Sequence, residues 1–172
     1  MKFTYFHIIG LSIGMVSSNW VLTGQTKKPY PTKPFHTAPV GLAAQIVKDN
    51  ESKDCLEAVY LGKLSAFAKA LKVTKVDLNR DGRLEYIVTP YEDDCFCSPR
   101  LPNRCMKAIY QKFGVKYKLL LGEENGNMLS DDVADLVPST TSTKGYLDII
   151  AISRFDGERT IYRYDGKRYH KQ

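Results

Sequence analysis

The sequence has little of the material from which catalytic sites are built. Its 172 residues include only three histidines, His7, His36 and His170, and none lies in a segment expected to form the core. The sequence also lacks the glycine patterns of a P-loop and of a dinucleotide-binding turn. Because a general base must stand beside the reacting group in an ordered site, these absences predict that the chain is not an enzyme.

One acidic run leaves an alternative open. Residues 92–94 read Glu-Asp-Asp and precede a cysteine. Paired carboxylates can hydrolyse glycosidic bonds, so a hydrolase that uses these three side chains is the competing interpretation. Consecutive acids in a loop more often form a solvated patch, and we favour that interpretation.

The most apolar stretch is too short to cross a bilayer, which takes about 20 residues. This stretch, residues 8–16, follows a single lysine and precedes two serines, as in a secretory signal peptide. We predict a signal peptide over residues 1–24 and a periplasmic or secreted location; a retained anchor or a buried strand is the alternative. Residues 25–39 contain four prolines and predict a linker, which leaves residues 40–172 as a single domain with no membrane span.

Cysteine is scarce, and its spacing is informative. The four cysteines are Cys55, Cys95, Cys97 and Cys105, and an even number in an exported chain predicts disulfides. A bond between Cys95 and Cys97 would close a very tight ring. We therefore expect Cys55 to pair with Cys95 or Cys97, and Cys105 to pair with the other. The spacing lacks a C-x2-C knuckle and no histidine is near, which argues against zinc.

The charge is modestly basic and mixed along the chain. The formal net charge is +6, with 25 basic and 19 acidic residues. A nucleic-acid-binding surface would cluster its basic residues and interleave aromatic ones in a recognisable module. The sequence shows no such module, so we predict no nucleic-acid partner.

Hydrophobic periodicity predicts helices first and strands afterwards. Apolar residues recur at helical spacing in residues 40–48, and a second helix is predicted from Ser52, a candidate N-cap, to about Tyr60. Residues 64–70 fit either class. From Leu71 the period changes to two, which indicates strands to the end of the chain.

The strand region contains an internal repeat. "KAIYQKFGVKY", residues 107–117, aligns without gaps on "RTIYRYDGKRY", residues 159–169. Upstream of each lies a second similar pair, "GRLEYIV" at 82–88 and "GYLDIIA" at 145–151. Two segments that recur in the same order indicate two copies of one structural unit.

Each copy reads as a strand, a loop and a hairpin, which makes a three-stranded antiparallel meander. One meander buries too little apolar surface to be stable alone, so we expect the units at about 71–120 and 130–172 to pack together. The predicted fold is mainly β (α+β), with two blade-like antiparallel β-meander repeats and a short N-terminal helical segment.

The loop in "KVDLNRDGRLEYIV" carries oxygen-bearing side chains at alternate positions, Asp77, Asn79 and Asp81, followed by a glycine. Ca2+ takes about six to eight oxygen ligands, and an EF-hand would place an acid at its twelfth position. That position is Val88, and the apolar residues before it predict a strand instead of a helix. Two interpretations stay open: one calcium site of another kind, or a plain turn in which the aspartates cap backbone amides.

The pattern D-x-[DN]-x-D-G-x-x-[DE], running directly into an apolar strand, resembles the FG-GAP/VCBS type of repeat found in integrin-like β-propellers. Residues 71–170 also resemble small exported bacterial proteins of unassigned function that share a cysteine-containing loop and a "YRYDGxxY" ending. The resemblance implies Ca2+ in the first unit only, because the second has "STKGYLD" at the equivalent place. The chain is too short for a closed propeller. The ligands implied by the resemblance are Asp77, Asn79, Asp81, the carbonyl of Arg83, and Glu85.

The expected compartment and the missing catalytic groups together predict an exported, non-enzymatic β domain that binds a macromolecular partner. An inhibitor or immunity protein of a secreted hydrolase is one concrete form, and a component of the cell envelope is another possible partner. The cysteine-held loop 93–105 mixes apolar and basic residues that suit a protein interface. The alternative is a calcium-stabilised structural or envelope protein with no specific activity. The predicted partner contacts are Phe96, Arg100, Leu101 and Arg104.

Overall fold

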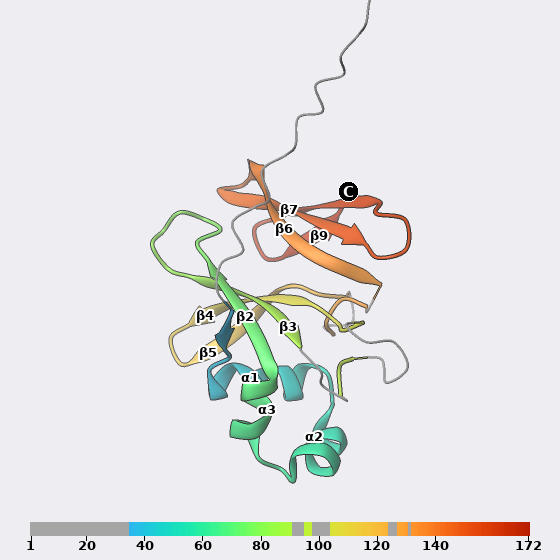
Figure 1. Ribbon diagram of the computed structural model, residues 1–172. Helices are drawn as coiled ribbons and strands as arrows, with labels where there is room; N and C mark the ends of the chain where they lie inside the picture. The colour runs from blue at the N-terminus through green and yellow to red at the C-terminus, as the bar shows by residue number, and fades with distance from the viewer. Residues whose placement is uncertain (1–34, 91–94, 98–103, 124–126, 131) are drawn as a thin grey trace, which may run out of the picture. The chain divides into compact units, whose positions relative to one another are not determined.

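The computed structural model describes residues 35–90, 95–97, 104–123, 127–130 and 132–172 (Figure 1). The predicted signal peptide and residues 25–34 of the predicted linker lie outside them. Within these ranges, no helix is both long and apolar enough to cross a membrane. The described elements are β1 (His36–Thr37), α1 (Val40–Asp49), α2 (Lys53–Tyr60), α3 (Leu64–Ala70), β2 (Leu71–Val76), β3 (Glu85–Pro90), β4 (Ala108–Phe113), β5 (Lys116–Leu121), β6 (Val133–Thr143), β7 (Tyr146–Ser153), β8 (Arg159–Tyr164) and β9 (Tyr169–Lys171).

The first helix, α1, agrees with the helical periodicity of residues 40–48. It begins directly after Pro39. The carbonyl of Pro39 accepts hydrogen bonds from the amides of Leu42 (2.9 Å) and Ala43 (3.1 Å). Leu42, Ala43 and Ile46 are buried along one side of α1. Each large aliphatic side chain among them contributes about 1.5–3 kcal/mol of transfer free energy, so the helix is held mainly by this face.

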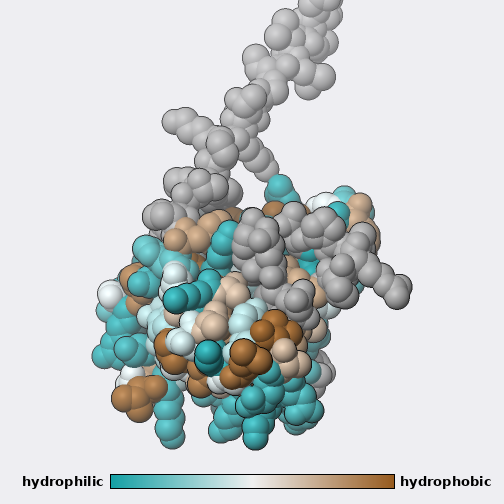
Figure 2. All heavy atoms as spheres, turned by 60° about the horizontal axis from the view of Figure 1, so that its bottom comes forward, coloured by the Kyte–Doolittle hydropathy of each residue, from teal (hydrophilic) through white to brown (hydrophobic). Residues whose placement is uncertain are grey.

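The next two helices are short and depend on packing for their stability. α2 begins directly after Ser52, as predicted, but the Ser52 side chain makes no capping hydrogen bond. The helix is followed by Leu61 in a left-handed conformation (φ 52°). Residues 64–70, which fit either class in the sequence, form α3 and bury Phe67 and Ala68. Figure 2 brings this helical end forward and shows apolar side chains in small groups between hydrophilic ones.

The first sheet has the strand order β1-β2-β3-β4-β5, with every neighbouring pair antiparallel. β1 corrects the predicted end of the linker, because His36 pairs with Val73 and Thr37 with Lys72. The amide of Ala38 then donates to the carbonyl of Leu71 (3.2 Å). The outer edge of β2 offers unpaired backbone groups, and this short segment satisfies some of them.

The second sheet has the order β6-β7-β8-β9 and is an antiparallel meander. Each predicted unit therefore holds four meander strands, β2–β5 and β6–β9, in place of the predicted three. The additional strand of the second unit is β6, whose sequence "VADLVPSTTST" contains Pro138 and shows little apolar alternation. Its pairing with β7 shifts register between Pro138 and Ser142, so its strand character comes from the neighbouring β7.

Residues aligned in the sequence occupy equivalent register positions in the two sheets. Ile87 pairs with Ile109, and the aligned Ile150 pairs with Ile161. The same holds in the hairpins, where Lys112 pairs with Tyr117 and Tyr164 pairs with Tyr169. The internal repeat, as a statement about two copies of one unit, stays a prediction.

Two clusters of buried side chains lie on the two faces of the first sheet. One cluster joins this sheet to the helices and includes Tyr110; the other joins it to the second sheet through Ile109 and Ile149. Neighbouring residues Ile87 and Val88 fall into different clusters, because successive side chains of a strand point to opposite faces. The predicted fold class, mainly β with a short helical segment, is confirmed.

Candidate functional site

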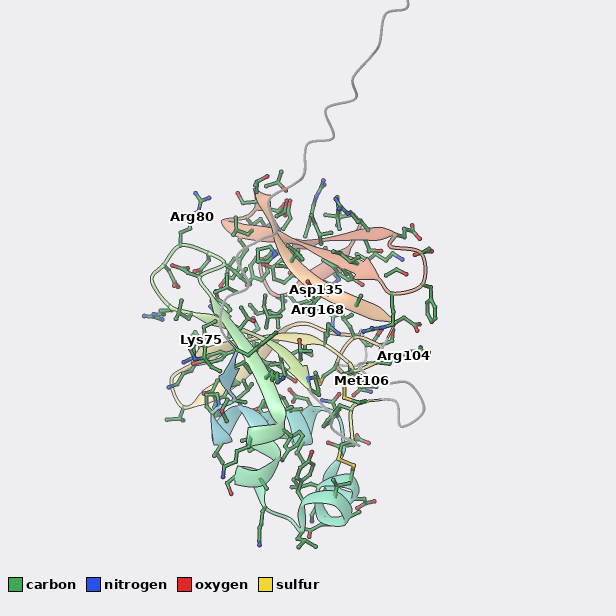
Figure 3. All side chains as sticks on the ribbon, in the orientation of Figure 1. Lys75, Arg80, Arg104, Met106, Asp135 and Arg168 are labelled. Carbon is green, nitrogen blue, oxygen red and sulfur yellow. A yellow bond between two sulfur atoms is a disulfide. The ribbon has the colours of Figure 1, made fainter. Side chains whose placement is uncertain are left out.

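The loop between β2 and β3 uses its acidic side chains to hold its own backbone. Asp77 accepts hydrogen bonds from the amides of Asp81 (3.2 Å) and Gly82 (3.0 Å). Asp81 accepts one from the amide of Arg83 (2.7 Å), and this bond lowers the pKa of its exposed carboxyl. Gly82 has φ 80° and Arg80 φ 60°, which tightens the turn. Figure 3 shows the Arg80 side chain pointing away from the sheets.

Glu85 begins β3 directly after this loop, and its side chain is completely buried. Its carboxylate accepts hydrogen bonds from the amide of Leu78 (2.8 Å) and from Nε2 of Gln111 on β4 (3.1 Å). Burial raises the pKa of Glu85, and these two bonds oppose the rise. The aligned residue of the second sheet, Asp148, is also buried and accepts hydrogen bonds from two threonine hydroxyls, each at 2.7 Å.

The side chains among the five ligands implied by the resemblance are engaged in hydrogen bonds within the fold in this conformation. Asp77 and Asp81 cap amides, Asn79 both accepts from the amide of Asp81 (3.1 Å) and donates to its carboxylate (3.0 Å), and Glu85 is bonded within the sheet. In the part of the chain that the structure describes, no three histidine, cysteine, aspartate or glutamate residues form a group that could hold a metal ion. These side chains therefore serve the turn here, and calcium binding stays a prediction.

Two residues that the sequence did not single out, Gln111 and Tyr146, join this loop to the second sheet. The hydroxyl of Tyr146, at the start of β7, accepts hydrogen bonds from Nδ2 of Asn79 (3.0 Å) and Nε2 of Gln111 (2.9 Å). The amide of Leu147 donates to the carbonyl of Leu78 (2.8 Å). No local pattern could reveal this contact, because Asn79 and Tyr146 are 67 residues apart.

The disulfides follow one of the two pairings that the sequence allows. Cys55 of α2 is bonded to Cys95, and Cys97 is bonded to Cys105. The first bond ties α2 to the segment that follows β3, and the second closes a short loop before β4. Disulfides persist in oxidising compartments and are rare in the cytosol, so the pair is typical of a protein that resides outside the cytoplasm.

Phe96, predicted as a partner contact, is buried instead. Its side chain is 5% exposed, and its ring centroid lies 5.6 Å from that of Phe67 on α3. The prediction for Phe96 is wrong, because a large apolar ring between two disulfide-bonded cysteines gains more from the core than from solvent.

Arg104, a second predicted contact, is engaged within the chain. Its guanidinium forms an ion pair with Asp132 (2.7 Å) and lies 5.0 Å from the ring centroid of Phe155, at the β7–β8 turn. This joins the disulfide-bonded segment to the second sheet, and it leaves Arg104 poorly placed for a partner. The remaining two predicted contacts, Arg100 and Leu101, lie outside the described residues.

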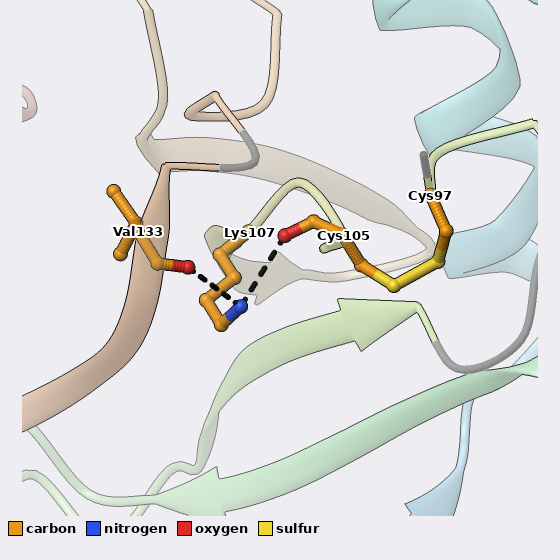
Figure 4. Close-up of a disulfide and its surroundings, with 4 residues drawn as sticks. All are labelled: Cys97, Cys105, Lys107 and Val133. Carbon is orange, nitrogen blue, oxygen red and sulfur yellow. Dashed lines mark hydrogen bonds between the residues drawn. A yellow bond between two sulfur atoms is a disulfide. The ribbon is translucent and has the colours of Figure 1, made fainter. Parts of the chain in front are cut away.

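Lys107 makes a similar link from the interior. It is only 3% exposed, and its ammonium donates to the carbonyl oxygens of Cys105 (3.2 Å) and Val133 (2.9 Å). Figure 4 shows the lysine between these two carbonyls, with the bond between Cys97 and Cys105 beyond. The segment after the disulfide is thereby fastened to the start of β6.

A concave, accessible surface lies where β3 begins and β4 ends, beside the turn of the β4–β5 hairpin. It is a hollow of about 500 Å3 with five lining residues. Around the hairpin turn the apolar side chains of Leu84, Phe113 and Val115 are 46%, 71% and 90% exposed; we call these three the hairpin-tip surface. Leu84 lines the hollow itself, whereas Phe113 follows Lys112 along β4 and therefore points to the opposite face. The residues that line the hollow are Arg83, Leu84, Tyr86, Lys112 and Gly114.

Comparisons with known proteins do not assign this site. No family model, curated protein or solved structure matches the chain. The resemblance to FG-GAP/VCBS repeats therefore stays a prediction, and function has to be argued from the surfaces of the chain itself.

Proposed function

We propose that this chain is an exported, non-catalytic β domain that binds a macromolecular partner through the tip of its β4–β5 hairpin. An inhibitor or immunity protein of a secreted hydrolase is one concrete form of this function. The proposed compartment is the periplasm or the extracellular space, and the two disulfides support it.

The observation that carries the proposal is the exposure of Val115 (90%) and Phe113 (71%) on either side of a glycine turn. A single exposed apolar residue is ordinary, whereas a group of them more often marks an interaction site, and these two large residues flank one turn. Aromatic side chains such as Phe113 are also enriched in protein interfaces. The turn belongs to a hairpin at the edge of a disulfide-supported domain, so it presents these residues on a rigid support.

The test is capture of a partner from periplasmic or secreted extract by three immobilised proteins. These are the wild type, the double variant Phe113→Ser/Val115→Ser, and Leu61→Asn, a control at a position that is 74% exposed and far from the hairpin in sequence. We expect a partner to be retained by the wild type and by Leu61→Asn and lost by the double variant. Specific capture by none, or equal capture by all three, would refute the proposal.

A calcium-stabilised structural protein is the second candidate. It is favoured by the contact between Asn79 of the acidic loop and Tyr146 of the second sheet. An ion held by the loop would stiffen the place where the two sheets meet, and would act on stability alone. Its test is the calcium dependence of melting described in the Discussion.

A further inference from the structure

We infer that the hollow beside the hairpin tip recognises an acidic segment of a protein partner. This inference rests on the proposed function, because it names the chemistry of the partner that the hairpin-tip surface would bind. It is carried by the position of the hollow, by the charges that line it, and by the apolar residues next to it.

The hollow lies on the face of the first sheet that also carries the helices, beside the start of α1. Leu84 and Tyr86 are two residues apart at the start of β3, so they share a face. Tyr86 packs edge-on against Tyr117 of β5, with ring centroids 5.7 Å apart. Tyr117 in turn contacts the start of α1, where a Cβ added to Gly41 would lie 3.4 Å from its ring.

The lining combines two cations with apolar surface and contains no acid. Arg83 and Lys112 are both exposed, and neither forms one of the ion pairs found among the described residues. Arg83 does act on Asp81 in the neighbouring loop, where it helps to lower the pKa of that carboxyl. Lys112 has no such neighbour in its hairpin, because residues 108–121 contain three lysines and no acid.

These features together favour an acidic peptide over other anions. A nucleic acid would need several stacking faces and a longer basic track, whereas the hollow is lined by two cations and a single aromatic ring. A free phosphate would have no use for the exposed apolar side chain of Leu84 that lines the hollow. A segment with carboxylates and apolar side chains satisfies both parts of the surface, and complementary charge gives specificity and fast association.

The experiment measures binding of a fluorescein-labelled peptide, EELEFEE, by anisotropy, with the uncharged analogue QQLQFQQ as comparison. We expect the wild type to bind the glutamate peptide, and salt to weaken this binding. The variant Arg83→Gln/Lys112→Gln should weaken it by at least about threefold, since two exposed charge pairs are lost. The control Arg163→Gln/Lys167→Gln, exposed positions on the second sheet, removes the same two charges and should leave binding unchanged.

A second measurement locates the peptide without any substitution. On titration of the wild type, the amide resonances of Leu84 and Gly114 should shift while those of β8 stay in place. Equal binding of both peptides, equal weakening in both double variants, or tighter binding of an oligothymidylate at the same resonances would each overturn the inference.

The two proposals can fail separately. If a partner is captured through Phe113 and Val115 but Arg83→Gln/Lys112→Gln captures it equally well, the proposed function stands and the acidic recognition is wrong. If the peptide binds at the hollow and no partner is captured from any extract, the hollow recognises acidic groups and the proposed function is wrong.

Discussion

The ammonium of Lys107 lies 2.9 Å from the carbonyl oxygen of Val133, which joins the segment before β4 to the first residue of β6. Beside it, the backbone of Lys107 forms an isolated antiparallel bridge with Leu129, which lies in the segment between β5 and β6. At the far end, Tyr146 receives hydrogen bonds from Asn79 and Gln111. Polar contacts thus connect the sheets at two places, with the apolar cluster between them.

Replacing the buried lysine should therefore weaken the domain. Lys107→Met nearly keeps the length of the side chain and removes the donor to one buried and one partly buried carbonyl. An unsatisfied buried group costs about 1–3 kcal/mol. We expect a loss of this size in the free energy of unfolding, measured by urea denaturation. Lys116→Met, at an exposed position, should change it by less than about 0.5 kcal/mol; equal losses in the two variants would contradict the assignment.

The two disulfides should contribute unequally. They join residues 40 and 8 positions apart, and loop-closure entropy assigns them about 4 and about 2.5 kcal/mol respectively. Cys55→Ser/Cys95→Ser should therefore lower the free energy of unfolding more than Cys97→Ser/Cys105→Ser does. Denaturation of both variants under non-reducing conditions measures the difference, and the opposite order would show that native contacts outweigh chain entropy.

Glu85 should make stability depend on pH in a defined direction. Burial raises its pKa above the ordinary value of 4.5, so the folded protein keeps this proton at pH values where the unfolded chain has released it. The contribution of Glu85 is most favourable below pH 4.5 and is lost as the pH rises through its folded pKa.

The variant Glu85→Gln should flatten this part of the profile. The measurement is the free energy of unfolding from pH 4 to 8, compared with that of Glu158→Gln, a change at an exposed position. If the pH dependence of the free energy of unfolding persists in Glu85→Gln and disappears in Glu158→Gln, it arises from Glu158, and the prediction for Glu85 is wrong.

Calcium should raise the melting temperature if the acidic loop binds it. A ligand at a hundredfold excess over its Kd stabilises the folded state by about 2.7 kcal/mol. We expect Ca2+ to raise the melting temperature of the wild type, EDTA to reverse the rise, and Mg2+ to have less effect. The variant Asp81→Ala loses the hydrogen bond to the amide of Arg83 with or without calcium. The quantity to compare is therefore the change in melting temperature that calcium causes in the wild type and in this variant. No shift in the wild type would leave the loop as a plain turn.

Several elements could be predicted because their information is local. The period of residues 40–48 defines α1, and Ser52 marks the start of α2. Gly114, with φ 62°, lies in the turn that the hairpin pattern requires. Ring size, a constraint that acts over a few residues, excluded a bond between Cys95 and Cys97 and left two disulfide pairings open. The structure decides between them, with Cys55 bonded to Cys95 and Cys97 to Cys105.

The parts that were missed depend on neighbours distant in the sequence. β6 has a weak strand pattern and is a strand because β7 supplies its hydrogen bonds. The composition of the cysteine-held loop predicts Phe96 at an interface, but the ring packs in the core against Phe67, which lies on α3. The resemblance implied Glu85 as a metal ligand, which stays a prediction, but the motif holds no information about Gln111, which bonds to Glu85 from another strand.

The sequence by itself determined the order and kind of the main elements, since helical and strand periods, turn glycines and cysteine spacing all act within a few residues. Only the tertiary structure decided which charged groups are buried, how Asn79 meets Tyr146, and which apolar residues are left in solvent. Those outcomes depend on the packing of two sheets against each other. Because burial results from that packing, it cannot be read from any single segment of the chain.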